Sequence, residues 1–84
     1  MNVVKLYTTP WCPYCVRAKH LLTSKGVGFD DIDVSRQPKL RLEMEKLSRR
    51  STVPQIWIGD KHVGGCDELF ALERAGKLEP MLTS

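Results

Sequence analysis

Two cysteines near the N-terminus, Cys12 and Cys15, are separated only by Pro13 and Tyr14. At this spacing two thiols can form a reversible disulfide, close a static disulfide or bind a metal ion together. Proline is favoured at the first position of a helix, where its missing N–H has no partner to lose. The sequence therefore predicts a helix that begins beside Cys12 and places Cys15 one turn further on.

A helix start favours the reversible dithiol. The N-terminal amides of a helix carry a partial positive charge, which stabilises a thiolate over a thiol. We therefore expect Cys12 to be exposed and nucleophilic, with Cys15 behind it as the resolving thiol. A static disulfide between them would close a loop too short to add much stability.

A zinc site is the alternative interpretation of the same cysteines. Cys12 and Cys15 could form a Cys₃His set with His62 and Cys66. The second pair has an H-x₃-C spacing and lies far downstream, and a single C-x-x-C motif is weak evidence for zinc. The sequence predicts no metal site but leaves this alternative open.

Length and composition restrict the class of protein. The chain has 84 residues, 42% hydrophobic and 27% charged, which is typical of a single small globular domain over residues 1–84. Its net charge of +3 comes from scattered side chains, too dispersed for a nucleic-acid interface. The N-terminus lacks a signal-peptide pattern, and no apolar stretch reaches membrane-spanning length. Together with an odd number of cysteines, this predicts a cytoplasmic protein with reduced thiols and no membrane partner.

The elements that must position the thiols follow the order β-α-β-α-β-β-α. Alternating and β-branched residues predict strands at 3–7, 29–34, 55–58 and 61–63. Apolar spacings predict helices from 13 to a stop at Gly26, over 37–47, and within 66–78 with Gly76 as the stop. Ser35 is the expected N-cap of the second helix, whose apolar face carries Leu40, Met44 and Leu47. Gly59-Asp60 is typical of a hairpin turn. A β-α-β unit has parallel strands and a hairpin has antiparallel ones, so the predicted fold is α/β, a four-stranded mixed sheet with helices on both faces.

Three segments together resemble the glutaredoxin family, specifically its small dithiol members of bacterial type. They are "CPYC" at 12–15, "TVPQIWI" at 52–58 and "GGCDEL" at 64–69. The resemblance runs along essentially the whole chain, with the motifs in the family's order. It implies a thioredoxin-like fold and an enzyme that reduces protein disulfides and glutathione mixed disulfides. Glutathione would be the co-substrate, with no tightly bound cofactor, and the protein would act as a monomer.

The resemblance also implies roles for individual residues. Cys12 is the nucleophile and Cys15 the resolving thiol. The residues implied in glutathione binding are Tyr14, Arg41, Thr52, Val53, Pro54, Gly65, Cys66 and Asp67. Among these, Arg41 would bind the glycine carboxylate and Asp67 the ammonium of the γ-glutamyl end.

Simpler interpretations exist for several of these residues. Arg41 could lie on a solvated helix face, Asp67 could serve only the first turn of its helix, and Cys66 could be a small buried hydrophobe. Pro54 is a candidate for a cis peptide bond, since cis bonds are nearly confined to proline, although a trans-proline can also open an edge strand.

Two positions depart from the family pattern. Thr9 stands where many relatives have a lysine, and Trp11 before the first cysteine is more typical of thioredoxins. His20 and His62 are expected on solvated surfaces.

Besides the glutathione-dependent enzyme, the sequence leaves two other functions to test. One is an iron–sulfur or zinc carrier on the same fold, and the other is a thioredoxin-like reductant served by a flavoenzyme.

Overall fold

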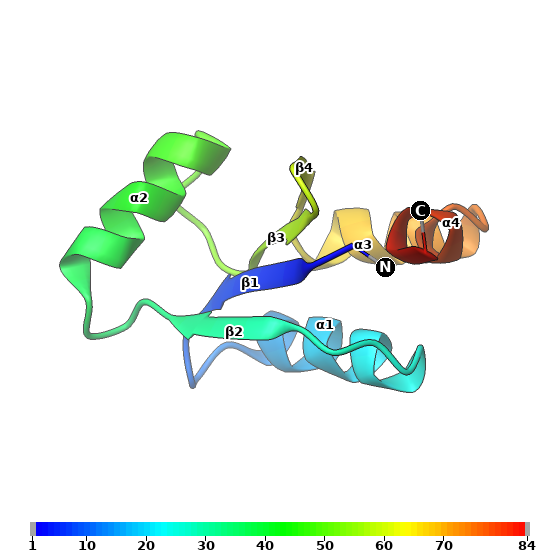
Figure 1. The fold of residues 1–84 in the computed structure, drawn as a ribbon. Coiled ribbons are helices and arrows are strands. Elements are labelled where there is room, and N and C mark those ends of the chain that lie inside the picture. The colour runs from blue at the N-terminus through cyan, green and yellow to red at the C-terminus, as the bar shows by residue number, and fades with distance from the viewer. Residues whose placement is uncertain (1, 84) are drawn as a thin grey trace.

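A four-stranded mixed sheet organises residues 2–83, the part of the chain that the computed structural model describes (Figure 1). The strands are β1 (Val4–Thr8), β2 (Asp30–Asp33), β3 (Gln55–Ile58) and β4 (Lys61–Gly64). In the order β2-β1-β3-β4, β1 is parallel to β2 and antiparallel to β3, and β3 and β4 form an antiparallel hairpin. The predicted mixed sheet and its final hairpin are confirmed.

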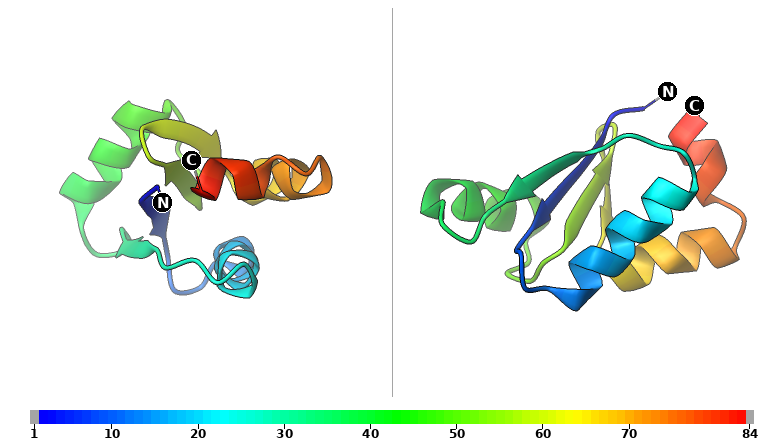
Figure 2. Two further views of the ribbon diagram at one scale, coloured as in Figure 1. Left: turned by 45° about the vertical axis from the view of Figure 1, so that its right-hand side comes forward. Right: turned by 90° about the horizontal axis from the view of Figure 1, so that it is seen from below.

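Helices cover both faces of this sheet, as predicted. They are α1 (Pro13–Ser24), α2 (Pro38–Ser48), α3 (Cys66–Arg74) and α4 (Leu78–Thr83). Figures 1 and 2 show α1 and α3 together on one face, while α2 stands at the other side of the sheet. Within residues 2–83, no helix combines the length and the apolar character that crossing a membrane requires.

Each face of the sheet has its own apolar cluster. On β1, Val4 and Leu6 point into the larger cluster while Tyr7 joins the smaller one, because successive strand residues face opposite sides. The larger cluster joins the sheet to α1, α3 and α4 through Val4, Leu6, Ala18, Leu22, Ile56, Ile58, Leu69, Leu78 and Leu82. The smaller one consists of Tyr7, Val34 and Met44, with Leu40 and Trp57 packed against it.

The helix α4 was not predicted. The chain turns at Gly76, whose φ of +71° suits glycine, and Leu78 and Leu82 then enter the larger cluster fully buried. Six residues are too few for a helix to be stable alone, so docking on the core must stabilise this one. The spacing of Leu78, Met81 and Leu82 at i, i+3 and i+4 was the signal that could have revealed it.

Two predictions about α2 were wrong. The N-cap is Gln37, not Ser35, because Pro38 takes the first helical position; the Ser35 N–H instead donates to Asp33 Oδ1 at 2.8 Å. Leu47 does not belong to the buried face and is 58% exposed, since α2 meets the core mainly through Met44 and Leu40.

The two ends of the described chain are joined. The Asn2 backbone N–H donates to the carbonyl of Leu82 at 3.1 Å, and the Asn2 side chain donates to the carbonyl of Met81 at 2.7 Å. Both views of Figure 2 place the N- and C-termini side by side. They lie near the start of β1, away from the end of this strand that leads to Cys12.

Candidate active site

Cys12 caps the start of α1. Its Sγ accepts a hydrogen bond from the Cys15 backbone N–H at 3.1 Å, and its thiol donates to the Val53 carbonyl at 3.6 Å. Pro13 is the first helical residue, as predicted. The Cys12 side chain is half-buried rather than fully exposed, and the capping amide would stay in place to stabilise a thiolate.

Cys15 has a different environment one turn further along α1. It is fully buried, and all three cysteines are free thiols. Burial first, and then its contact with the Cys12 side chain, raises the pKa of Cys15 to about 12. At neutral pH Cys15 is therefore a protonated thiol, and the two cysteines are chemically inequivalent.

A groove of about 380 Å³ opens beside Cys12, between the loop before β3 and the start of α3. We call it the thiol groove, because the Val53 carbonyl on its wall contacts the Cys12 thiol. Its lining residues are Tyr14, Arg50, Thr52, Val53, Pro54, Gly65, Cys66, Asp67 and Glu68. The structure thus brings together every residue predicted for glutathione binding except Arg41.

The Val53–Pro54 peptide bond is cis, which confirms the sequence-based candidate. Gly64 precedes the groove-lining Gly65. Its φ of +117° is a conformation that L side chains rarely adopt, and a Cβ at this position would collide with the Glu68 carboxylate. Glycine is therefore required where β4 turns into α3 along the groove.

Arg50 and Glu68 line the groove but were not predicted. The Glu68 carboxylate accepts the Gly65 backbone N–H at 2.7 Å and forms an ion pair with the Arg50 guanidinium at 2.8 Å. The Gly65 N–H first, and then Arg50, lower the pKa of Glu68. The signal for Glu68 was its place three residues after the helix-capping position, where an acid closes a capping box. Arg50 carried no comparable local signal.

Arg41 lies outside the lining of the thiol groove. Its guanidinium donates to the Ser51 carbonyl at 2.5 Å and reaches Glu45 at 3.4 Å. Arg41 is therefore held against the segment that enters the groove at Thr52, and its role toward a ligand stays a prediction.

Cys66 and Asp67 occupy the first turn of α3. Cys66 is only 4% exposed, as expected for a small buried hydrophobe, and burial raises the pKa of its thiol. The Asp67 side chain is exposed at the groove, where it is available to a cationic ligand group.

The Cys₃His set is not assembled. Among residues 2–83, no three His, Cys, Asp or Glu side chains are placed to hold a metal ion. His62 was expected on an exposed surface, but it is half-buried: its ring packs on Trp57, and its Nε2 lies 2.7 Å from Gln55 Oε1. His20 is exposed, as predicted.

The two positions that depart from the family pattern lie beside Cys12. The Thr9 carbonyl accepts the Cys12 N–H at 3.4 Å, so this residue shapes the loop through its backbone. Trp11 is 73% exposed next to the thiol and does not line the groove.

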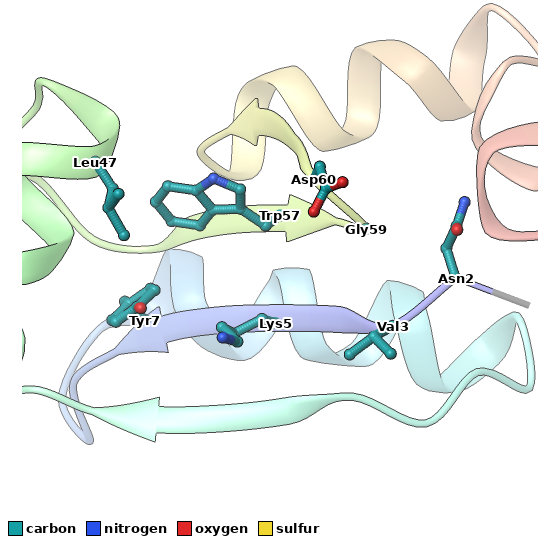
Figure 3. A pocket seen from close by; sticks show the side chains of 8 residues that line it. All are labelled: Asn2, Val3, Lys5, Tyr7, Leu47, Trp57, Gly59 and Asp60. Carbon is teal, nitrogen blue, oxygen red and sulfur yellow. The ribbon is translucent and has the colours of Figure 1, made fainter.

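A second pocket, of about 550 Å³, lies on the sheet face opposite α1 and α3 (Figure 3). The rings of Tyr7 and Trp57 meet edge to face at 5.4 Å along its floor, and Leu47 of α2 forms one side. No cysteine lines this pocket, so the chemistry belongs to the smaller thiol groove.

A sheet of this topology with two inequivalent free thiols at the start of its first helix defines the class of dithiol–disulfide oxidoreductases with a thioredoxin-like fold. Within that class the chain belongs to the glutaredoxin family, whose model matches residues 4–63. It is therefore an enzyme, a glutathione-dependent thiol–disulfide oxidoreductase.

Similar proteins match along nearly the whole chain. A glutaredoxin of Pseudomonas aeruginosa is 57% identical over 84 residues, with both chains covered completely. Glutaredoxin 3 of Escherichia coli strain K12 is 52% identical over 82 residues, covering 98% of this chain and 99% of the relative. The crystal structure of a buckwheat glutaredoxin–glutathione complex superimposes with a TM-score of 0.91 at 33% identity, over 98% of this chain and 77% of the other.

Proposed function

We propose that Cys12 is the nucleophile of this oxidoreductase, that Cys15 resolves its mixed disulfides, and that the thiol groove holds glutathione. The observation that carries the proposal is the contact between the Cys12 thiol and the Val53 carbonyl. Cys12 is not itself a lining residue, but its sulfur contacts Val53, which lines the groove together with most of the predicted binding residues.

A protein disulfide would react in two exchanges. The Cys12 thiolate attacks one sulfur of the substrate, the substrate S–S bond breaks, and the departing thiolate takes a proton. Cys15 then loses its proton and attacks Cys12 Sγ, which forms the internal disulfide and releases the second substrate thiol. Two glutathione molecules reduce that disulfide and leave as oxidised glutathione.

A glutathionylated protein would need only Cys12. Its thiolate attacks the sulfur of the glutathione, the protein thiol leaves, and a second glutathione releases the first as the oxidised dimer. Cys15 lies outside this cycle and can only divert it into the internal disulfide.

The thiol groove suits glutathione by its chemistry. An extended peptide can pair with the backbone at Val53, and the amides at the start of α3 suit a carboxylate. Asp67 offers a negative charge to the γ-glutamyl ammonium, and Tyr14 an aromatic wall. On the far side, Arg41 would have to turn from Glu45 to reach the glycine carboxylate. The glutathione complex of the buckwheat relative supports this assignment.

The proposal extends to the setting of the enzyme. Glutathione is a co-substrate rather than a resident group, and the partners are glutathionylated or disulfide-containing proteins. We propose a monomer that works in the cytoplasm, where thiols are kept reduced.

Steady-state rates of three cysteine variants on two substrates test the mechanism. Cys15→Ser should keep deglutathionylation and lose most reduction of a protein disulfide, because an intramolecular thiol acts at high effective concentration. Cys12→Ser should lose both activities. Cys66→Ser should change neither much if the buried Cys66 side chain serves only in packing. The proposed division of roles is wrong if Cys15→Ser abolishes deglutathionylation or if Cys12→Ser retains it.

A coupled assay tests the choice of reductant. Wild-type protein should turn over with glutathione and glutathione reductase, and far more slowly with thioredoxin reductase. The reverse result would favour the thioredoxin-like reductant.

A further inference from the structure

A hydrogen-bonded chain of three side chains runs beneath the thiol groove. Gln55, the first residue of β3, is fully buried. Its Nε2 donates to the Thr52 carbonyl at 3.0 Å and to Thr52 Oγ1 at 3.2 Å. Its Oε1 lies 2.7 Å from Nε2 of His62 on β4.

The chemistry of these groups sets the direction of every hydrogen bond. A carbonyl oxygen only accepts, so the Gln55 amide must turn its nitrogen toward Thr52 and its oxygen toward His62. His62 must then donate from Nε2. Burial, and then the nearby Arg50, lower the pKa of His62, so the ring is neutral and carries its proton on Nε2.

The His62 ring is held by more than this one hydrogen bond. It packs on Trp57 at a centroid distance of 4.6 Å, and Trp57 in turn meets the buried Tyr7 ring. The donor end of the chain is therefore anchored in the sheet, while its other end, Thr52, is exposed in the groove.

The direction of the chain has a consequence for Thr52. Because Oγ1 accepts the Gln55 N–H, the Thr52 hydroxyl keeps its own hydrogen for another acceptor. The same Gln55 amide holds the Thr52 carbonyl, so both the backbone and the hydroxyl of this groove residue depend on one buried side chain.

We propose that Gln55 and His62 are positioning residues of the glutathione site, which hold Thr52 so that its hydroxyl donates to a carboxylate or carbonyl oxygen of the bound tripeptide. This inference rests on the proposed function of the thiol groove. Neither residue touches the groove itself; both act through Thr52.

The first test is a double-mutant cycle on the glutathione KM. In Gln55→Glu, the carboxylate still accepts from His62, but it can no longer donate to the Thr52 carbonyl and it takes the Thr52 hydroxyl hydrogen, which turns the donor away from the groove. We expect about a fivefold to thirtyfold rise in KM with kcat nearly unchanged, and a rise in Thr52→Val that is no larger, because this variant loses only the hydroxyl. The double variant should be no worse than Gln55→Glu alone, and Thr52→Ser should behave as wild type.

His62 supplies a test that leaves the buried Gln55 intact. His62→Phe keeps a ring against Trp57 but removes the donor, so the KM should rise, whereas His62→Gln offers an amide N–H and should retain affinity. His20→Phe, the same substitution at an exposed histidine of α1, is the matched control and should leave KM unchanged. Nitrogen chemical shifts of the His62 ring should show the Nε2–H tautomer in wild type.

The possible results distinguish a failure of this inference from a failure of the proposed glutathione site on which it rests. If Asp67→Ala and Thr52→Val both leave the glutathione KM unchanged, the groove is not the glutathione site and both ideas fail. If these variants raise KM but His62→Phe does not, or the Gln55 and Thr52 effects multiply, the positioning role alone is wrong. An Nδ1–H tautomer of His62 would also overturn it.

Discussion

At the residue scale, the two thiols of one motif differ because one caps a helix and the other enters the core. Cys12 stays half-buried at the helix start with an amide pointing at its sulfur. Cys15 is fully buried, and its pKa is raised to about 12. The spacing predicts that both belong to one site, but their inequivalence depends on packing that only the fold supplies.

This difference predicts an order of alkylation. At about pH 8 only on the order of 10⁻⁴ of a thiol with such a pKa is ionised, so iodoacetamide should modify Cys12 first and Cys15 at least about a hundredfold more slowly than a free cysteine. Peptide mapping by mass spectrometry measures both rates, and Cys12→Ser isolates Cys15. Burial is the main cause of the shift, so Cys15 should stay slow in that variant. Rapid modification of Cys15 would contradict the assigned roles.

Asp67 supplies the second prediction at this scale. Removing its exposed carboxylate should raise the glutathione KM about 5–30-fold, since a charge-assisted contact contributes about 1–2 kcal/mol, with little change in kcat. Asp60→Ala, at the β3–β4 turn and outside the groove, is the matched control. Equal KM values for the two variants would show that Asp67 does not meet the ligand.

At the element scale, the groove depends on how α3 begins. Glu68 accepts the Gly65 N–H and binds Arg50, so one carboxylate joins the helix start to the segment that leads into Thr52. The pKa of Glu68 is lowered by these contacts. A lowered pKa means that the stabilisation is complete above the ordinary glutamate pKa and is lost as pH falls through the folded-state value.

Glu68→Gln keeps an acceptor for the Gly65 N–H but removes the charge, so it should lower the free energy of unfolding by less than about 1 kcal/mol at neutral pH. The gap between variant and wild type should close as the pH falls through the lowered folded-state pKa of Glu68, where the wild-type carboxyl becomes protonated too. Urea unfolding across this range measures the gap. A gap that stays constant with pH would show that the charge of Glu68 does not stabilise the fold.

The elements differ in how well the sequence predicts them. Pro13 and Pro38 mark the starts of α1 and α2 because proline tolerates few other helical positions, and the residues at 55–58 match β3 without error. The helix α4 escaped prediction because its stability comes from contacts distant in sequence. Leu47 was misplaced because apolar spacing does not reveal how closely α2 approaches the sheet.

The residues of the candidate site also differ in how well the sequence predicts them. The family motifs predicted seven of the groove-lining residues but missed Glu68, whose capping-box position was a local signal. Arg50 enters only through its contact with Glu68, 18 residues away. The chain from His62 through Gln55 to Thr52 was also missed, because pairs between neighbouring strands depend on register rather than on a motif.

At the scale of the whole molecule, the two faces of the sheet differ in how many helices pack on them. The larger cluster draws on α1, α3 and α4, whereas the smaller depends mainly on α2. Lys25, which follows α1, forms ion pairs with Glu73 of α3 at 2.6 Å and with Glu79 of α4 at 3.1 Å. The short final helix is part of the larger cluster through the buried Leu78 and Leu82.

Leu82→Ala should lower the free energy of unfolding by about 2–4 kcal/mol, because it leaves a cavity at a fully packed site. Leu42→Ala is the same substitution on the exposed face of α2 and should cost less than about 0.5 kcal/mol. Urea titrations of both variants provide the comparison. Equal losses would mean that α4 frays from the core in solution.

The pairing of Asn2 with the last helix means that the covalent order of the elements can be changed without moving the thiols. A short linker could join the two ends, and new ends could be opened at Gly28, whose surroundings are vacant. Such a circular permutant would begin with β2 and carry α1 last, yet Cys12 would still follow β1 and still face Val53. We expect it to retain deglutathionylation within about tenfold of the parent. If the permutant folds but loses activity, the covalent order of the elements affects the thiol groove.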